Sequence, residues 1–310
     1  MENSGRLCPA LVPNHQSPDP QTLPLFMPDL TSPQNPRVKN AVRLRDRRHR
    51  EKQGKIIIDG ARELRRAIGA GVKLAELFVC PSLCQSEDAQ YLLNALPQLG
   101  GEVFHVSEAV FERLAFGRRT EGMLGVAEMP RPTLAAISAS WSGTGWGDSL
   151  TVTPTKTPTK TPLVAVLEGV EKPGNVGAVL RSADAAGVSA VIVADGRTDL
   201  FNPNAIRASL GTIFTTPACE ATSQETLAWL RARNFAVFAA RVDGSAPYTE
   251  VDYRGPTAIV LGSEAAGLSS AWTGDDIRAV RLPMLGKADS LNVSVTAAVL
   301  FFEALRQRQL

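Results

Sequence analysis

Apolar and polar positions in the first half of the chain follow the pattern of a small α/β domain. The segment KIIIDGARELRRAIGAGVKLAELFVC begins with an apolar run, Ile56–Ile58, which predicts a strand. Leu64, Ile68 and Val72 follow at helical spacing, and LAELFV predicts the next strand. SEDAQYLLNALPQLGGEVFHVS repeats the helix and the strand, and EGMLGVAEMP adds a last strand. We therefore expect one small α/β domain over residues 37–131.

The second half of the chain, residues 163–310, contains five apolar strand segments, most of them followed by helix-like segments. The strand segments are LVAVLEGV, VSAVIVAD, FAVFAARV, TAIVLGSE and IRAVRLPM. Continuous runs of Val, Ala and Ile are typical of parallel strands buried on both faces, so we expect a mostly parallel sheet with helices on both faces. Ligands of such sheets bind at the carboxyl ends of the strands. Three clusters of Gly and polar residues follow strands there: GVEKPGNVGAVLR, GSEAAGLS and LPMLGKADSLN.

Two stretches outside these domains lack a periodic pattern. Residues 1–36 contain eight prolines, and we interpret them as a disordered tail. Residues 132–162 are rich in Ser, Thr, Gly and Pro and carry PTKT twice, which predicts a flexible linker. This linker contains Trp141 and Trp146, and two aromatic residues do not make a core.

Positive charge is concentrated in residues 37–55, although the net charge of the whole chain is only +2. This segment, RVKNAVRLRDRRHREKQGK, holds nine Lys and Arg residues against two acids. Two interpretations stay open. The segment is either a solvated helix face or a surface that contacts the phosphates of a nucleic acid and releases its counterions.

The remaining composition excludes several kinds of site. The chain has 44% hydrophobic and 21% charged residues, no apolar run long enough to span a membrane and no secretory signal pattern, so we expect a cytoplasmic protein without a membrane partner. The scattered cysteines predict no metal site and suit a reducing compartment; they are Cys8, Cys80, Cys84 and Cys219. All three histidines precede residue 106, so the second domain contains no imidazole for a catalytic triad, a metal site or a proton shuttle; they are His15, His49 and His105.

Two familiar nucleotide-binding motifs are absent. GNVG lacks the G-x-G-x-x-G spacing of a dinucleotide-binding turn. GSEAAGLS, residues 262–269, has the glycine spacing of a P-loop, but Leu268 stands where the phosphate-binding Lys belongs and Glu264 lies inside the loop. An acidic side chain without a Lys argues against binding a triphosphate.

Taken together, the three clusters resemble the SpoU/TrmH family (SPOUT superfamily) of S-adenosylmethionine-dependent RNA ribose 2′-O-methyltransferases. The first family motif is Asn175-x-Gly177-x-x-x-Arg181, the second is IVLGSEAAGL over residues 259–268, and the third is RLPMLGKADSLNVSVTAAVLFFEALR over residues 281–306. They occur in the family's order and at its usual separations. The resemblance extends more loosely to residues 45–131, which are similar to an L30e-like RNA-binding substrate domain. The cue there is IIIDGARELRRAI, where this chain has Asp59 in place of the usual Glu.

The resemblance implies roles for particular residues. The catalytic set is Asn175, Arg181, Glu264 and Asn292. Arg181 would activate the ribose hydroxyl; because a guanidinium stays protonated, the simpler role is to stabilise the oxyanion and anchor a phosphate. Asn175 would orient Arg181 or the ribose, and Glu264 and Asn292 would hold the substrate and the first-motif side chains. Apolar walls and backbone groups would form the cofactor pocket around Leu261, Gly262, Gly267, Leu282, Met284 and Leu291.

These positions also have purely structural interpretations. Asn175 suits a helix N-cap, Arg181 a helix surface, and Glu264 a solvated loop. Ser290 suits the cap of the last helix. The buried stripe of that helix would then be Leu291, Val295, Ala298, Phe302 and Leu305.

The resemblance implies an enzyme that methylates ribose 2′-hydroxyls, with ribosomal RNA preferred as substrate and S-adenosylmethionine as cofactor. It also implies a trefoil knot and a homodimer formed through the last helix, and it implies no metal. The alternatives are a tRNA 2′-O-methyltransferase, a non-catalytic RNA-binding protein on the same fold, and a nucleotide-dependent oxidoreductase on a doubly wound sheet.

Overall fold

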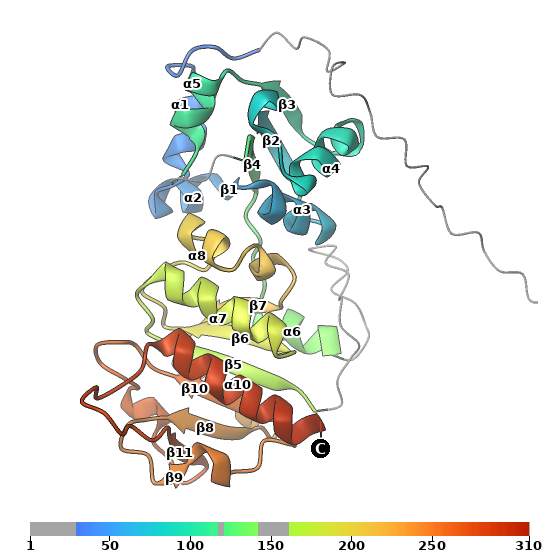
Figure 1. The fold of residues 1–310 in the computed structure, drawn as a ribbon. Helices are drawn as coiled ribbons and strands as arrows, with labels where there is room; N and C mark the ends of the chain where they lie inside the picture. Colours follow the sequence, from blue (N-terminus) through green and yellow to red (C-terminus); the bar gives the residue numbers. More distant parts are fainter. Residues whose placement is uncertain (1–28, 117–120, 142–160, 310) are drawn as a thin grey trace, which may run out of the picture.

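The computed structural model describes residues 29–116, 121–141 and 161–309, which form two α/β domains with one sheet each (Figure 1). The sheet of the N-terminal domain has the order β1-β4-β2-β3, in which β4 is antiparallel to both neighbours and β2 is parallel to β3. The elements of this domain are α1 (Pro36–Arg43), α2 (Arg47–Gln53), β1 (Lys55–Asp59), α3 (Ala61–Gly69), β2 (Leu74–Val79), α4 (Glu87–Ala95), β3 (Glu102–His105), α5 (Glu108–Leu114) and β4 (Met123–Glu128), with 3₁₀ turns at Pro81–Leu83 and Leu96–Gln98.

The second domain contains a seven-stranded sheet of order β7-β6-β5-β10-β8-β11-β9, and every neighbouring pair in it is parallel. The expected parallel α/β fold is therefore confirmed. Its elements are α6 (Leu134–Trp141), β5 (Leu163–Glu168), α7 (Pro173–Ala185), β6 (Ala190–Ala194), α8 (Pro203–Ala208), β7 (Ala218–Ala221), α9 (Ser223–Arg231), β8 (Ala236–Ala240), β9 (Ala246–Pro247), β10 (Thr257–Leu261), β11 (Ile277–Arg281) and α10 (Val293–Gln309), with 3₁₀ turns at Thr212–Phe214, Tyr248–Glu250 and Ser270–Trp272.

Helices cover both faces of this sheet, which explains its continuous apolar strands. All residues of β5, β6 and β10 are buried, and alternate residues face opposite clusters. One face packs against α7, α8 and α10, and the other against α6 and α9. Gly177 permits close contact between α7 and α8, because a Cβ there would lie 2.4 Å from the carbonyl oxygen of Ala205.

The sequence patterns missed several elements. Strands β7 and β9 lie at the two edges of the sheet, and their four and two residues are too short to give an apolar run. The prediction of a flexible linker over 132–162 is wrong for residues 134–141, which form α6. Ile137 is fully buried, and the ring of Trp141 lies against that of Trp229, with centroids 5.5 Å apart and planes tilted by 58°. Residues 142–160, including Trp146, lie outside the described residues.

The predicted disordered tail, residues 1–36, also needs correction at its end. Leu30 pairs with Val106 beside β3, and Asp29 accepts a hydrogen bond from the backbone N–H of His105 at 3.0 Å. Pro36 begins α1, capped by Asn35. Residues 1–28 lie outside the described residues.

The predicted buried stripe of the last helix is wrong. Leu291, which precedes the helix, Val295 and Phe302 are 41%, 48% and 49% exposed, and Ala298 and Leu305 are only partly buried. The side chains that face the core are Val293, Ala297, Leu300, Phe301 and Ala304. Helix α10 is apolar around most of its circumference, so its periodicity does not select the side that meets the sheet.

Polar contacts join the two domains where α8 lies against β1 (Figure 1). The fully buried Arg50 of α2 donates two hydrogen bonds to the carboxylate of Asp199, at 2.6 and 3.2 Å. Arg66 of α3 donates to the carbonyl oxygen of Leu210 at 2.6 Å. No helix among the described residues has both the length and the hydropathy needed to cross a bilayer.

Candidate active site

Three side chains that the sequence places far apart meet at the carboxyl edge of the seven-stranded sheet. Asn175 lies in the first turn of α7, Glu264 follows β10, and Asn292 follows β11. The side-chain amide of Asn175 donates a hydrogen bond to Oε1 of Glu264. Nδ2 of Asn292 donates in turn to Oδ1 of Asn175 at 3.3 Å. Because parallel strands end at one edge, the sheet brings these loops together.

The local structure fixes the orientation of Asn292. Its Oδ1 accepts hydrogen bonds from the backbone N–H and the hydroxyl of Ser294, at 2.9 and 2.7 Å, so Asn292 caps the start of α10. The alternative interpretation, a cap at Ser290, is therefore wrong. These bonds occupy the amide oxygen of Asn292 and leave its Nδ2 to meet Asn175.

The structural interpretation of Asn175 as a helix cap is also wrong. Lys172 occupies the N-cap position of α7, and no side chain caps this helix. Asn175 instead uses both its amide nitrogen and its amide oxygen in contacts with the two other loops. Glu264 is likewise not merely a solvated loop acid, since its carboxylate accepts from Asn175.

The loop that carries Glu264 folds back on itself. Ser263 and Gly267 exchange two backbone hydrogen bonds of 3.1 and 3.0 Å. Gly267 has a φ of +66°, and a Cβ on Gly262 would lie 2.2 Å from the carbonyl carbon of Gly267. Both positions therefore require glycine, one for its conformation and one for close contact.

The residues predicted to bind the cofactor border this loop and the segment after β11. Leu261 is buried at the end of β10, whereas Leu282 and Met284 are half-buried and Leu291 is 41% exposed. The backbone N–H groups from Met284 to Leu291 donate no hydrogen bond to any other described residue. Half-exposed apolar side chains beside backbone N–H groups with no partner among the described residues fit a ligand such as adenine. The apolar side chains would contact the face of its ring, and the N–H groups would bind the polar atoms at its edge.

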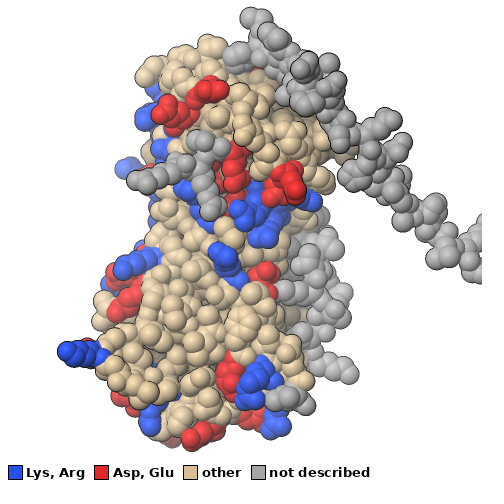
Figure 2. Space-filling view, in the orientation of Figure 1, with Lys and Arg blue, Asp and Glu red and all other residues tan. Residues whose placement is uncertain are grey.

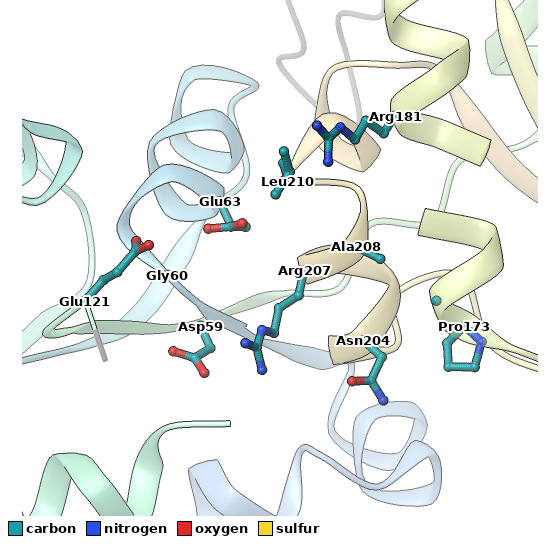
Figure 3. A pocket seen from close by; sticks show the side chains of 11 residues that line it. Asp59, Gly60, Glu63, Glu121, Pro173, Arg181, Asn204, Arg207, Ala208 and Leu210 are labelled. Atoms are coloured by element: carbon teal, nitrogen blue, oxygen red, sulfur yellow. The ribbon is translucent and has the colours of Figure 1, made fainter. Parts of the chain in front are cut away.

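Arg181 does not join the Asn175–Glu264–Asn292 cluster. It lies six residues after Asn175 on the same helix, which corresponds to a rise of about 9 Å and a different helix face. Its side chain makes no hydrogen bond or ion pair with another described residue and instead lines a cavity of about 590 Å³ between the domains (Figure 3). Pro173 and Gly174 line the same cavity, which therefore extends along α7 to the turn that contains Asn175.

The opposite wall of this cavity is mostly acidic and was not predicted from the sequence as part of a site. It includes Asp59, Glu63 and Glu121 of the N-terminal domain, and α8 contributes Asn204 and Arg207 (Figure 3). The only cue was the acid–glycine pair after β1, which the family resemblance picked out at Asp59.

Asp59 and Arg207 hold one backbone segment between the domains. Oδ2 of Asp59 accepts from the N–H of Phe116 at 2.6 Å, and Arg207 donates to the carbonyl oxygen of the same residue. Burial raises the pKa of Asp59 to about 6, and the hydrogen bond from Phe116 and the charge of Arg207 only partly offset this effect.

The basic segment, residues 37–55, forms helices α1 and α2. Some of its cations make contacts inside the protein, and the others are exposed. Arg50 is buried against Asp199, and Arg45 donates to the carbonyl oxygens of residues 113–115 at the end of α5. The exposed cations are Arg37, Lys39, Arg43, Arg47, Arg48 and Lys52. Figure 2 shows Lys and Arg side chains along this edge of the N-terminal domain.

The described residues contain no group of three or more His, Cys, Asp and Glu side chains arranged to hold a metal ion. The cysteines within them, Cys80, Cys84 and Cys219, are buried free thiols.

Comparison with known proteins connects both domains to one enzyme family. Residues 162–302 match the SpoU rRNA Methylase family, and residues 35–125 match the MRM3-like substrate binding domain. The 23S rRNA (guanosine(2553)-2′-O)-methyltransferase RlmP of Bacillus subtilis is 26% identical over 89% of this chain and 98% of its own length. The 23S rRNA (guanosine-2′-O-)-methyltransferase RlmB of Bordetella pertussis is 34% identical over 71% of this chain and 84% of its own length.

Solved structures give the same result. A crystal structure of an RNA 2′-O ribose methyltransferase is 39% identical, covers 91% of this chain and 99% of its own, and superposes with a TM-score of 0.74. The SpoU methyltransferase AviRb of Streptomyces viridochromogenes, in complex with AdoMet, is 26% identical, covers 89% of this chain and 98% of its own, and also has a TM-score of 0.74. The chain therefore belongs to the SpoU rRNA methylase family.

Proposed function

We propose that this chain transfers a methyl group from S-adenosylmethionine to a ribose 2′-hydroxyl of ribosomal RNA. The observation that carries the proposal is the hydrogen-bonded cluster of Asn175, Glu264 and Asn292, formed by the three segments that the sequence shares with SpoU enzymes. The names of the relatives RlmP and RlmB, both 23S rRNA methyltransferases, favour ribosomal RNA over tRNA.

The cofactor is assigned to the segments around Gly262–Gly267 and Leu282–Leu291. In the second segment apolar side chains border backbone N–H groups that donate to no other described residue. S-adenosylmethionine supplies an electrophilic methyl group when bound. Leu282, Met284 and Leu291 would enclose its apolar parts, and backbone groups would bind its polar edge.

Arg181 is assigned to the hydroxyl. The ribose hydroxyl must lose its proton to water before or while its oxygen attacks the methyl group, and this loss places negative charge on that oxygen. A permanently charged guanidinium that has no partner in the described protein and lines an open cavity suits the stabilisation of this oxygen, or the anchoring of an adjacent phosphate. Asn175, in the first turn of the same helix, and Glu264, which accepts a hydrogen bond from Asn175, would fix the ribose by hydrogen bonds.

The exposed cations of α1 and α2 would hold the RNA backbone, which makes binding weaker at high salt. The proposed location is the cytoplasm, where ribosomal RNA is found.

A homodimer is the proposed assembly. The exposed face of α10 and the loop before it carries Leu291, Val295 and Phe302, an apolar surface that a second copy would cover. Phe302→Glu should convert a dimer into a monomer in light scattering, whereas the same charge at Val242, an exposed residue in the loop after β8, should not. A monomeric wild-type chain would contradict this assignment. The trefoil knot stays a prediction from the family resemblance.

The experiment that tests the function maps alkali-resistant positions in total RNA incubated with S-adenosylmethionine and the protein. A 2′-O-methyl group removes the hydroxyl that attacks the neighbouring phosphate, so one new protected position in ribosomal RNA is expected. Arg181→Ala should retain RNA binding and lower the rate of transfer by about 100-fold. A protected position in tRNA identifies the alternative substrate, whereas RNA binding without any transfer identifies a non-catalytic protein. Tight NAD binding without S-adenosylmethionine binding identifies an oxidoreductase.

A further inference from the structure

A buried carboxylate outside the proposed catalytic set lies directly beneath the loop that carries Glu264. Glu168 is the last residue of β5 and is only 6% exposed. Its Oε2 accepts a hydrogen bond from the backbone N–H of Ser269 at 2.7 Å. Its Oε1 accepts from the hydroxyls of Ser269 and Ser223, at 2.6 and 2.8 Å.

Glu168 forms no ion pair with any described residue, so neutral donors alone compensate its carboxylate. A buried carboxylate is unfavourable unless hydrogen bonds replace its hydration, and bonds to a charged acceptor are stronger and shorter than neutral ones. Two of the three donors belong to Ser269. The carboxylate therefore fixes the position of that residue more tightly than a neutral side chain can.

Ser269 is the far end of the loop that starts at Gly262. The near end is fixed by β10, and the two backbone bonds between Ser263 and Gly267 shape the part between them. Glu264 projects from this turn to meet Asn175. Beyond Ser269 the chain enters the 3₁₀ turn Ser270–Trp272, in which Trp272 is buried, and the bonds to Glu168 fix Ser269 between this turn and the loop.

Glu168 also begins the segment that leads to Asn175. Gly169 follows it with a φ of +62°, and a Cβ on Gly169 would lie 3.7 Å from Cβ of Ser263, so the two segments are in contact. One carboxylate therefore connects the backbone before Asn175 to the loop that presents Glu264.

We propose that Glu168 is a positioning residue that holds the Gly262–Leu268 loop in the conformation that binds S-adenosylmethionine and presents Glu264. It acts through Ser269 and does not touch the substrate. This inference rests on the proposed function, because it assigns the cofactor to that loop.

Ser223 provides a matched control. It donates to the same Oε1 atom of Glu168, but it belongs to α9, so this bond does not hold the loop. Ser223→Ala therefore removes one hydrogen bond from Glu168 and leaves both bonds to Ser269 in place. Glu168→Gln keeps the size of the side chain. The N–H of Ser269 then faces either the amide N–H₂, which cannot accept its hydrogen bond, or the amide oxygen, which is a weaker, neutral acceptor.

The test compares the wild type, Glu168→Gln and Ser223→Ala in calorimetry with S-adenosylmethionine and in steady-state methylation of ribosomal RNA. Glu168→Gln should weaken S-adenosylmethionine binding by about tenfold, raise its KM by a similar factor and lower kcat, while the KM for RNA stays unchanged. Ser223→Ala should change the affinity by less than about twofold. A merely structural role would reduce the amount of folded enzyme and thus kcat, without raising the KM for the cofactor.

Two results overturn the inference while the proposed function stands: wild-type affinity in Glu168→Gln, or an equal loss of affinity in Ser223→Ala. A wild-type protein that binds no S-adenosylmethionine overturns the proposed function and the inference together. If Glu168→Gln does not fold, Ser269→Ala takes its place. It keeps the backbone bond to Glu168 but removes the hydroxyl bond to Glu168 and the 3.3 Å bond that the same hydroxyl accepts from the N–H of Ala271, and it should weaken binding by about threefold. Unchanged binding in that variant also overturns the inference.

Discussion

The side-chain amide of Asn175 donates a hydrogen bond to the carboxylate of Glu264, which lies 89 residues later in the chain. Asn175→Asp replaces this donor with a second carboxylate oxygen, and two acceptors at hydrogen-bonding distance repel each other. We expect the rate of methyl transfer to fall by about 100-fold, as measured with labelled S-adenosylmethionine, and the melting temperature to change little because the pair is exposed.

The complementary change supplies the control. In the double variant Asn175→Asp/Glu264→Gln the donor and the acceptor exchange positions, so the hydrogen bond can form again. This variant should recover at least about tenfold of the lost rate. If the double variant is as slow as Asn175→Asp alone, the bond between the two side chains is not what the reaction requires.

The second prediction concerns the turn in the proposed cofactor site. Gly262→Ala places a Cβ 2.2 Å from the carbonyl carbon and 2.4 Å from the oxygen of Gly267, so the loop has to move. We expect the affinity for S-adenosylmethionine, measured by calorimetry, to fall by more than about tenfold. Gly255→Ala is the matched control, because a Cβ at Gly255 meets no atom within 4 Å. Equal affinities in the two variants would argue that the cofactor binds elsewhere.

The third prediction concerns the buried ion pair between the domains. Asp199→Asn leaves the Arg50 guanidinium, whose side chain is 1% exposed, without its charged partner. We expect a loss of about 3–5 kcal/mol in the free energy of unfolding, measured in urea. Asp276→Asn removes one partner of the Arg231–Asp276 pair, whose side chains are 51% and 50% exposed, and should cost less than about 1 kcal/mol. Similar losses in both variants would contradict the structural role of Arg50.

The fourth prediction concerns pH. Burial raises the pKa of Asp59 to about 6, above its value of about 3.9 in an unfolded chain, so the folded state binds this proton more tightly. Stability should therefore fall as the pH rises from about 4 to about 6, by up to about 3 kcal/mol from this group. Asp59→Asn, which mimics the protonated acid, should remove this dependence in urea unfolding and be more stable than the wild type at about pH 7.

Asp276→Asn serves again as a control. The hydrogen bond from Arg231 lowers the pKa of Asp276, so its titration lies below this pH window and the slope should persist in that variant. A slope that survives in Asp59→Asn would assign the pH dependence to another group.

Most of the first domain and the five long strands of the second could be predicted. The periodicity of apolar residues, which distinguishes helices from strands and buried faces from exposed ones, is visible within a few neighbouring residues. The short edge strand β9, only two residues long, carries no such pattern. Helix α6 was assigned to a linker because Ser, Thr and Gly dominate the surrounding composition, yet Ile137 is buried and Trp141 is half-buried against α9. Local composition reports only on the residues of the segment itself. Whether that segment packs as a helix depends on α9, which lies far away in the sequence.

The candidate site likewise contains residues that the sequence predicted and residues that it did not. The three motifs predicted Asn175, Glu264 and Asn292, which the structure brings together, but their order along the chain gave no indication that Arg181 would lie outside this cluster and line a cavity opposite the acidic residues of the N-terminal domain. Glu168 was passed over as the end of an apolar strand, since its two serine partners lie 55 and 101 residues away.

By itself the sequence determined the parallel α/β architecture, the absence of histidine from the second domain and the three loops that carry polar side chains, because these depend on residue identity and local spacing. Only the tertiary structure decided which side chains hydrogen-bond at the sheet edge, which face of α10 is left exposed, and which of the basic residues are used to join the domains. Those outcomes depend on contacts between segments as much as 149 residues apart, as for Arg50 and Asp199, and no local pattern contains them.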